Sequence, residues 1–293
     1  MNQIALLFFF LLFSTRVAHG QNTLSPETKS QLESLNELRA TSMRAESDKE
    51  RIEANNMFKS KLKNLIASNH KFPFDSIKNF GLTHSPNKAF SFYTWNIITD
   101  DYEYTYFNWV RFKNGDLLEL VDQSKDAIDP PFETYSYKKW YGALYYEIIP
   151  IKDKKEGLYY VLLGWDGNGS ESTKKVIDVM YFDEKYDEWR FGKKVFYVPF
   201  QDNYRIIMEY SAEVTMSLKY HKKRKQIVFD HLVPASVGME GIYEYYVPDM
   251  SFDALEYRKD QWYFIQNVDV RGEQTMENYT YPIVNTPSPS GTK

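Results

Sequence analysis

The sequence predicts a mainly β protein, built from antiparallel hairpins, with an α-helical segment at its N-terminal end. Aromatic residues make up 17% of the chain, and several short runs alternate apolar and polar side chains, as half-buried strands do. Turn residues separate these runs. The helical segment is indicated by residues 27–72, which contain neither Gly nor Pro.

Residues 1–20 have the features of a secretory signal peptide, with an apolar run from Ile4 to Phe13 and small residues at Ala18 and Gly20. We expect cleavage before Gln21. The apolar run is too short for a membrane span, which requires roughly 20 residues. The chain also lacks cysteine, whereas exported eukaryotic domains of this size commonly carry disulfides. The sequence therefore predicts a bacterial secreted or periplasmic protein with no membrane span after signal cleavage.

Residues 21–70 are expected to form the helical segment. Ser25 can cap a helix that begins at Pro26, a residue favoured at the first helical position. From Ala45 to Asn56 the chain is almost wholly polar or charged. This pattern predicts either two helices or one long helix with a solvated middle.

Residues 71–284 are expected to form the antiparallel β domain. The pair Asn114-Gly115 predicts a two-residue type I′ turn, because this turn needs positive φ at both positions. The runs Ala143–Ile149 and Leu158–Trp165 are apolar on both faces, which predicts strands in the interior of a stack.

The sequence is compatible with two arrangements of these strands. Roughly five aromatic hairpin units can be marked, near residues 85–121, 139–166, 174–198, 204–232 and 242–267. This spacing suits a small β-propeller-like body. A two-sheet sandwich with long hairpins fits the same pattern. Residues 285–293, rich in Pro, Ser, Thr and Gly, are expected to be a disordered tail.

Four segments resemble a group of uncharacterised (hypothetical) secreted proteins from Gram-negative bacteria. The segments are 85–95 (SPNKAFSFYTW), 140–146 (WYGALYY), 162–168 (LLGWDGN) and 174–179 (KKVIDV). The resemblance covers about residues 85–265. It implies export and a β architecture, and it implies no catalytic residue.

Composition and motifs exclude several functions. The formal net charge of −4 gives no basic footprint for nucleic acid. Without cysteine there can be no thiolate zinc site, iron–sulfur cluster or thiol nucleophile. The sequence also has no nucleophile elbow, zinc-protease motif or phosphate- or dinucleotide-binding glycine loop. We therefore expect no cofactor.

Two further patterns contain residue types that bind metals or catalyse reactions. Residues 166–172 (DGNGSES) offer oxygen ligands at alternate positions, as calcium loops do, but Ile177 occupies the position where an EF-hand needs an acid. We interpret them as a Gly-rich turn and expect no metal. Asp230 and His231 are neighbours on a predicted strand and face opposite ways, so they are not expected to form a dyad.

The leading hypothesis is a non-enzymatic exported binding module, and the expected partner is a carbohydrate or an envelope protein. Six tryptophans and many tyrosines could build a ligand platform, although most should fill the core. Trp140, Tyr141, Trp165 and Asp166 lie at strand ends beside turns, where binding residues concentrate, and they are the candidate ligand-binding residues.

The alternative is a carbohydrate-active or other hydrolase that uses paired carboxylates. Four acids lie within apolar strands and are the candidates: Glu147, Asp178, Glu209 and Asp230. A hydrolase should bring two such acids together in one pocket. A binder should present aromatic side chains without them.

Overall fold

The computed structural model describes residues 24–68, 71–198 and 201–270. It confirms a mainly β body of antiparallel sheets preceded by a helical segment. The expected signal peptide (1–20) and the expected tail (285–293) lie outside the described residues.

The helical segment is a pair of helices, α1 (Pro26–Arg44) and α2 (Asp48–Ser68). Of the two arrangements expected from the sequence, the structure has the two-helix one. Ser25 caps α1, because its Oγ accepts a hydrogen bond from the backbone N–H of Thr28 at 3.1 Å. Neither helix, nor any other in the described part of the chain, is long and apolar enough to cross a membrane.

Three β-sheets follow in the described part of the chain. The first sheet holds, in order, β1 (Gly81–His84), β2 (Phe90–Ile98), β3 (Tyr104–Phe112) and β4 (Leu117–Val121). The second holds β5 (Tyr135–Ser136), β9 (Glu188–Phe191), β8 (Ser172–Asp183), β7 (Gly157–Asp166) and β6 (Leu144–Asp153), with β12 (Ile206–Ser211) also paired to β8. The third holds β11 (Gln201–Asn203), β10 (Phe196–Val198), β16 (Gln261–Ile265), β15 (Tyr246–Arg258), β14 (Gln226–Pro234) and β13 (Leu218–His221).

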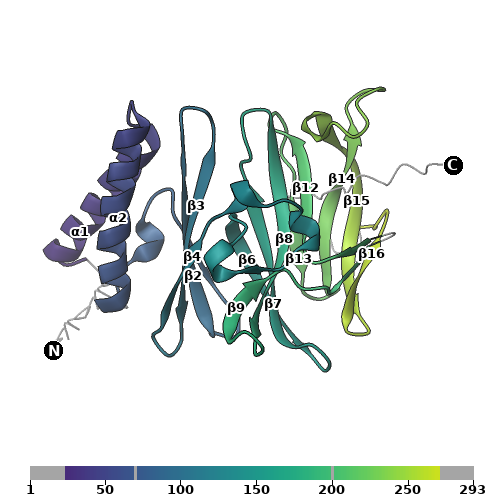
Figure 1. The fold of residues 1–293 in the computed structure, drawn as a ribbon, viewed down its shortest axis with the longest axis horizontal. Helices are drawn as coiled ribbons and strands as arrows, with labels where there is room; N and C mark the ends of the chain where they lie inside the picture. The colour runs from purple at the N-terminus through teal and green to yellow at the C-terminus, as the bar shows by residue number, and fades with distance from the viewer. Residues whose placement is uncertain (1–23, 69–70, 199–200, 271–293) are drawn as a thin grey trace, which may run out of the picture.

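The helical pair and the three sheets stack face to face in that order (Figure 1). The sheets do not radiate from a centre as propeller blades would, and a third sheet extends the two-sheet sandwich. The second sheet is the middle one, which explains why β7 is apolar on both faces: Leu162 packs toward the first sheet and Val161 toward the third.

Each interface between layers has its own apolar core. Between helices and first sheet, Phe58 and Leu62 of α2 pack with Trp95 of β2 and Trp109 of β3. The other two cores join the first sheet to the second and the second to the third. Continuous cores of this kind hold the strand ends at fixed distances from one another, and the candidate site is built on those ends.

The turn between β3 and β4 differs from the predicted one. Gly115 has φ +100°, but Asn114 is absent from the residues with positive φ, so the turn is not type I′. The N–H of Gly115 bonds the carbonyl of Phe112, and the N–H of Phe112 bonds the carbonyl of Asp116. This pattern is a three-residue loop: a tight turn followed by a glycine in a left-handed position. The hairpin forms as predicted, with one more loop residue.

Candidate functional site

Two pockets open at one end of the second sheet, on opposite sides of the β7–β8 hairpin turn. The first pocket, of about 180 Å³, lies between the first and second sheets and is lined by Tyr106, Tyr141 and Asp166, among others. The second pocket, of about 300 Å³, lies on the other face of the second sheet and is lined by Trp165 and Lys175, among others. Because successive residues of a strand face opposite ways, Trp165 and Asp166 of β7 point into different pockets.

Tyr104 forms the wall that the two pockets share. Its ring lies directly over the hairpin turn, since a Cβ atom on Gly167 would be only 2.2 Å from its Cζ atom. The ring meets Trp165 edge to face, with centroids 5.8 Å apart, and stacks on Tyr106 at 6.1 Å. Both Tyr104 and Trp165 are half-buried, so each can offer part of its ring to a ligand.

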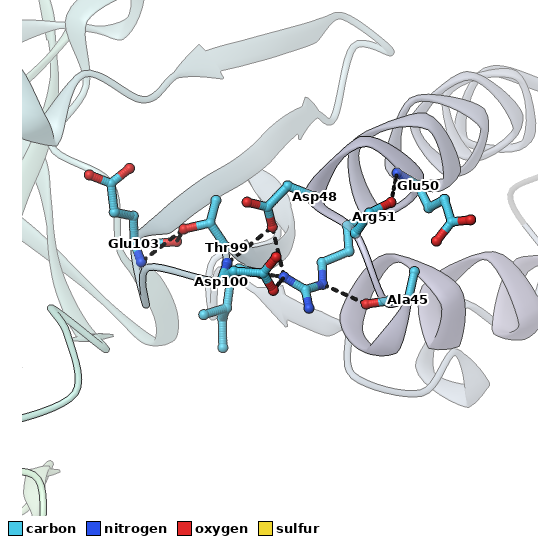
Figure 2. A network of polar contacts seen from close by, with 9 residues as sticks. Ala45, Asp48, Glu50, Arg51, Thr99, Asp100 and Glu103 are labelled. Atoms are coloured by element: carbon cyan, nitrogen blue, oxygen red, sulfur yellow. Dashed lines mark hydrogen bonds and ion pairs between the residues drawn. The ribbon is translucent and has the colours of Figure 1, made fainter.

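The loop before Tyr104 is fastened to the helical pair (Figure 2). Arg51 near the start of α2 forms ion pairs with Asp48, at 2.7 Å, and with Asp100 in the β2–β3 turn. The backbone N–H of Asp100 also donates to Asp48 Oδ1 at 3.1 Å. This network holds the turn that leads into β3, and thereby helps to position Tyr104.

Asp166 is the centre of the first pocket, and its carboxylate is fully engaged. Its Oδ1 accepts hydrogen bonds from the Tyr106 hydroxyl at 2.7 Å and from the N–H of Asn168 at 2.9 Å, and its Oδ2 accepts from the Tyr141 hydroxyl at 3.1 Å. Burial, reinforced by the charge of Asp166, raises the pKa of both tyrosines. They therefore stay protonated and act as donors to Asp166.

A half-buried acid, Asp122, supports the same region from the end of the first sheet. It accepts hydrogen bonds from the backbone N–H of Tyr106 at 2.8 Å and from the N–H of Ser124 at 2.9 Å. Burial raises the pKa of Asp122, and these hydrogen bonds oppose that rise. Its contacts bind it to the backbone, which is the role of a structural carboxylate.

Lys175 is the charged group of the second pocket. It lies opposite Trp165 in the β7–β8 register, and burial lowers the pKa of its amine to about 8. Its Nζ atom is 5.2 Å from the centre of the Tyr146 ring. Tyr210 lines the pocket beside it, and burial raises the pKa of that hydroxyl to about 12. The pocket thus combines aromatic walls with one partly desolvated amine.

The candidate acids of a hydrolase do not converge. Asp178 is fully buried and forms an ion pair with the equally buried Arg205, with Nε and Oδ2 3.1 Å apart. It also accepts a hydrogen bond from the Tyr145 hydroxyl at 3.0 Å. Asp178 has no access to a substrate in this arrangement.

The other three acids lie apart and have partners. Glu209 accepts a hydrogen bond from Ser172 Oγ at 2.5 Å. Glu147 accepts one from the N–H of Tyr220 at 3.3 Å, and Asp230 accepts one from the N–H of Ser217 at 3.0 Å. His231, the neighbour of Asp230, pairs with Asp253, with Nδ1 and Oδ2 3.1 Å apart.

Three of the four sequence-predicted ligand-binding residues lie at the two pockets. Tyr141 and Asp166 line the first pocket and bond each other, and Trp165 lines the second. The expectation that Trp140 binds a ligand is not supported, because Trp140 is fully buried and its Nε1 donates to the Tyr145 hydroxyl at 3.1 Å. The Trp140 ring packs against Tyr145 of β6 and Phe191 of β9, and its backbone N–H bonds the carbonyl of Val121 in β4, so Trp140 lies in the core between the first and second sheets.

Sequence reasoning missed Tyr104, Lys174 and Lys175 as site residues. Lys175 carried a usable signal, since it shares a strand face with the apolar Ile177, and a cation on an apolar face calls for an explanation. Tyr104 carried none, because nothing local indicates that it crosses to the β7–β8 turn.

Within the described ranges, no group of three or more His, Asp or Glu side chains is arranged to hold a metal ion. The loop of residues 166–172 forms the β7–β8 connection, in agreement with its interpretation as a turn.

Comparison of the chain with protein-family models, with curated proteins and with solved structures gives no match.

Proposed function

We propose that this chain is an exported, non-enzymatic binding protein that holds a saccharide across the two pockets, with Tyr104 and Trp165 as the aromatic platform. One observation carries the proposal. The half-buried ring of Tyr104 forms the wall that the two pockets share and meets the half-buried ring of Trp165 edge to face, and both pockets also carry polar side chains beside these rings. A sugar ring has an apolar C–H face that packs on an aromatic ring, and hydroxyl groups around its edge that need hydrogen-bond partners.

Polar groups surround this platform at the positions such hydroxyls would need. Asn168 and Lys174 line the first pocket, and Thr173, Thr215 and Lys175 line the second. Amide, hydroxyl and ammonium groups supply both donors and acceptors. The β2–β3 and β7–β8 turns are held in place by the Arg51 network and by the core, so the platform is preorganised.

The alternative hydrolase receives less support. Two acids line the first pocket, Asp166 and Glu103. Asp166 uses both oxygens for tyrosine and backbone donors, and Glu103 pairs with Lys125. Glycoside hydrolysis needs one acid free to donate a proton and another free to attack or to activate water. Neither acid is free in this arrangement.

Titration calorimetry and tryptophan fluorescence against a panel of neutral and acidic oligosaccharides test the proposal on the full exported chain. Trp165→Ala should weaken binding at least tenfold, whereas Trp165→Phe should keep much of it. Tyr186→Ala is the control, because Tyr186 is 54% exposed and lies in the β8–β9 turn, away from the pockets. Binding that survives both Trp165→Ala and Tyr104→Ala, or no binding to any saccharide, contradicts the proposal.

A further inference from the structure

The two neighbouring lysines of β8 are in different electrostatic situations. Lys174 faces the first pocket, bonds Asn168 and lies 3.7 Å from Glu209 Oε2. Lys175 faces the second pocket, and among the residues that the structure describes no carboxylate oxygen lies within 4.0 Å of its Nζ atom. The acid that acts on it from a distance is Asp230, which is held by the N–H of Ser217 at 3.0 Å.

An amine in this position costs folding free energy. Burial removes water from Lys175, and the charge of Asp230, which acts from a distance, offsets this loss only in part. The ring of Tyr146, 5.2 Å away, also compensates only in part, since a cation–π contact is weaker than the hydration that burial removes. Groups that cost stability and also line an open pocket are candidates for function.

The wall opposite the lysine defines what could pair with it. Trp165 and Tyr210 present aromatic surface, and Val214 and Met216 of the segment leading to the third sheet present apolar surface. Thr215 adds a hydroxyl donor. None of the residues that line this pocket is acidic. An anionic group that enters would meet an ammonium without a competing carboxylate on the wall.

We propose that Lys175 anchors a carboxylate of the ligand, so that the second pocket selects an acidic sugar, such as a uronic acid unit, over its neutral counterpart. This inference rests on the proposed saccharide function and names the substrate class. The ammonium of Lys175 donates to the sugar carboxylate, and the ring of Trp165 packs on the apolar face of the same sugar unit. Such a charge-assisted hydrogen bond is stronger than a hydrogen bond between neutral groups.

A matched pair of probes isolates the carboxylate. Oligogalacturonate and the same oligosaccharide with its carboxyl groups reduced to alcohols differ only in the acid. Calorimetry on the full exported chain at pH 7 should show oligogalacturonate binding at least tenfold more tightly than the reduced form. Lys175→Met should remove that preference. Lys185→Met is the control, because Lys185 is an exposed lysine of the β8–β9 turn that lines neither pocket, and it should keep the preference.

Four outcomes separate this inference from the function on which it rests. A preference for the acid that Lys175→Met abolishes supports both. Equal binding of the two probes, or a preference that Lys175→Met leaves unchanged, overturns the inference and keeps saccharide binding. If neither oligosaccharide binds but benzoate binds in a manner that depends on Lys175, the carboxylate anchor stands and the saccharide function fails. If none of the three probes binds, both proposals are overturned.

Discussion

The ring of Tyr104 lies so close above Gly167 that a Cβ atom there would be 2.2 Å from Cζ of the tyrosine. This contact joins the first sheet to the β7–β8 turn of the second, and it fixes the wall between the two pockets. Gly167 is needed here for close approach. Its φ lies outside the left-handed region, so conformation does not require a glycine at this position.

Gly167→Ala should therefore displace the tyrosine ring without unfolding the protein. The atoms that a Cβ would meet belong to the far end of the Tyr104 side chain, which can rotate away. We expect a loss of unfolding free energy of about 1 kcal/mol or less, with a several-fold loss of saccharide affinity. Gly169→Ala is the matched control in the same turn, because a Cβ there meets nothing within 4 Å. Equal affinity in the two variants would contradict the role assigned to Tyr104.

The buried pair of Asp178 and Arg205 predicts a structural role for the aspartate. Asp178→Asn leaves the guanidinium of Arg205 without its counter-charge in a fully buried position. We expect the free energy of unfolding to fall by about 3–5 kcal/mol, measured by urea denaturation. Asp183→Asn, on the same strand in a more exposed and longer contact with Arg190 at 3.9 Å, should cost about 1 kcal/mol or less. If Asp178→Asn keeps the stability of the parent protein but abolishes a hydrolase activity that the parent shows, the result would favour the hydrolase hypothesis instead.

Much of the fold could be predicted from local sequence. Ser25 and Pro26 indicated where the first helix begins, and the run Leu158–Trp165, apolar on both faces, indicated a strand of an inner layer. Sequence could not give the number or order of the layers. An apolar strand face shows that something covers it, but the covering strand is chosen by tertiary packing.

The same limit applies to the candidate site. Trp165 and Asp166 could be selected because they end a strand beside a glycine-rich turn. Trp140 meets the same local criterion and is nevertheless fully buried, because it packs in the core between the first and second sheets. The role of Tyr104 depends on a contact across 63 positions of sequence with Gly167, and local patterns do not carry contacts of that kind.

Arg39 is expected to hold the helical pair on the first sheet. Its fully buried guanidinium donates to the carbonyl of Asn79 at 2.9 Å and to that of Asn96 at 3.1 Å. Arg39→Met would remove both of these part-buried hydrogen bonds, and a hydrogen bond to a charged group contributes about 1.5–3 kcal/mol. Urea denaturation and limited proteolysis of the helices measure the effect. Arg44→Met, at an exposed position of the same helix, is the control and should change the free energy of unfolding by about 0.5 kcal/mol or less. A similar loss of stability in both variants would refute the role assigned to Arg39.

The β3–β4 hairpin depends on one glycine conformation. Gly115 has φ +100°, which a β-branched residue adopts only with strain. Gly115→Val should lower the free energy of unfolding by about 1–2 kcal/mol, seen as a lower melting temperature. Gly169→Val is the control, since Gly169 also lies in a turn with open space around it but without a left-handed φ. A melting temperature that Gly115→Val leaves unchanged would show that the loop adjusts at no cost.

Lys175 predicts a pH-dependent stability with a defined sign. The pKa of its amine is about 8 in the folded protein, against an ordinary value of 10.5, so between these values the unfolded chain binds more protons. The free energy of unfolding attributable to Lys175 therefore rises with pH through this window, and the cost is fully present below pH 8. Lys175→Met should be more stable than the parent protein at pH 7, by about 1–3 kcal/mol.

That difference should shrink as the pH rises from about 8 to 10.5 and the amine loses its proton in both states. Asp230, Tyr146 and Tyr210 also face this region, but they are present in both proteins, so subtracting the two stability curves removes most of their contribution. Urea denaturation at pH 6, 7, 8, 9 and 10 supplies both curves. Lys174→Met, which removes a lysine that is already paired with Glu209, should show no such gain at pH 7. If Lys175→Met is less stable than the parent protein at pH 7, the amine has a stabilising partner within the folded protein. That result would contradict the proposal that Lys175 is available to bind a ligand's carboxylate.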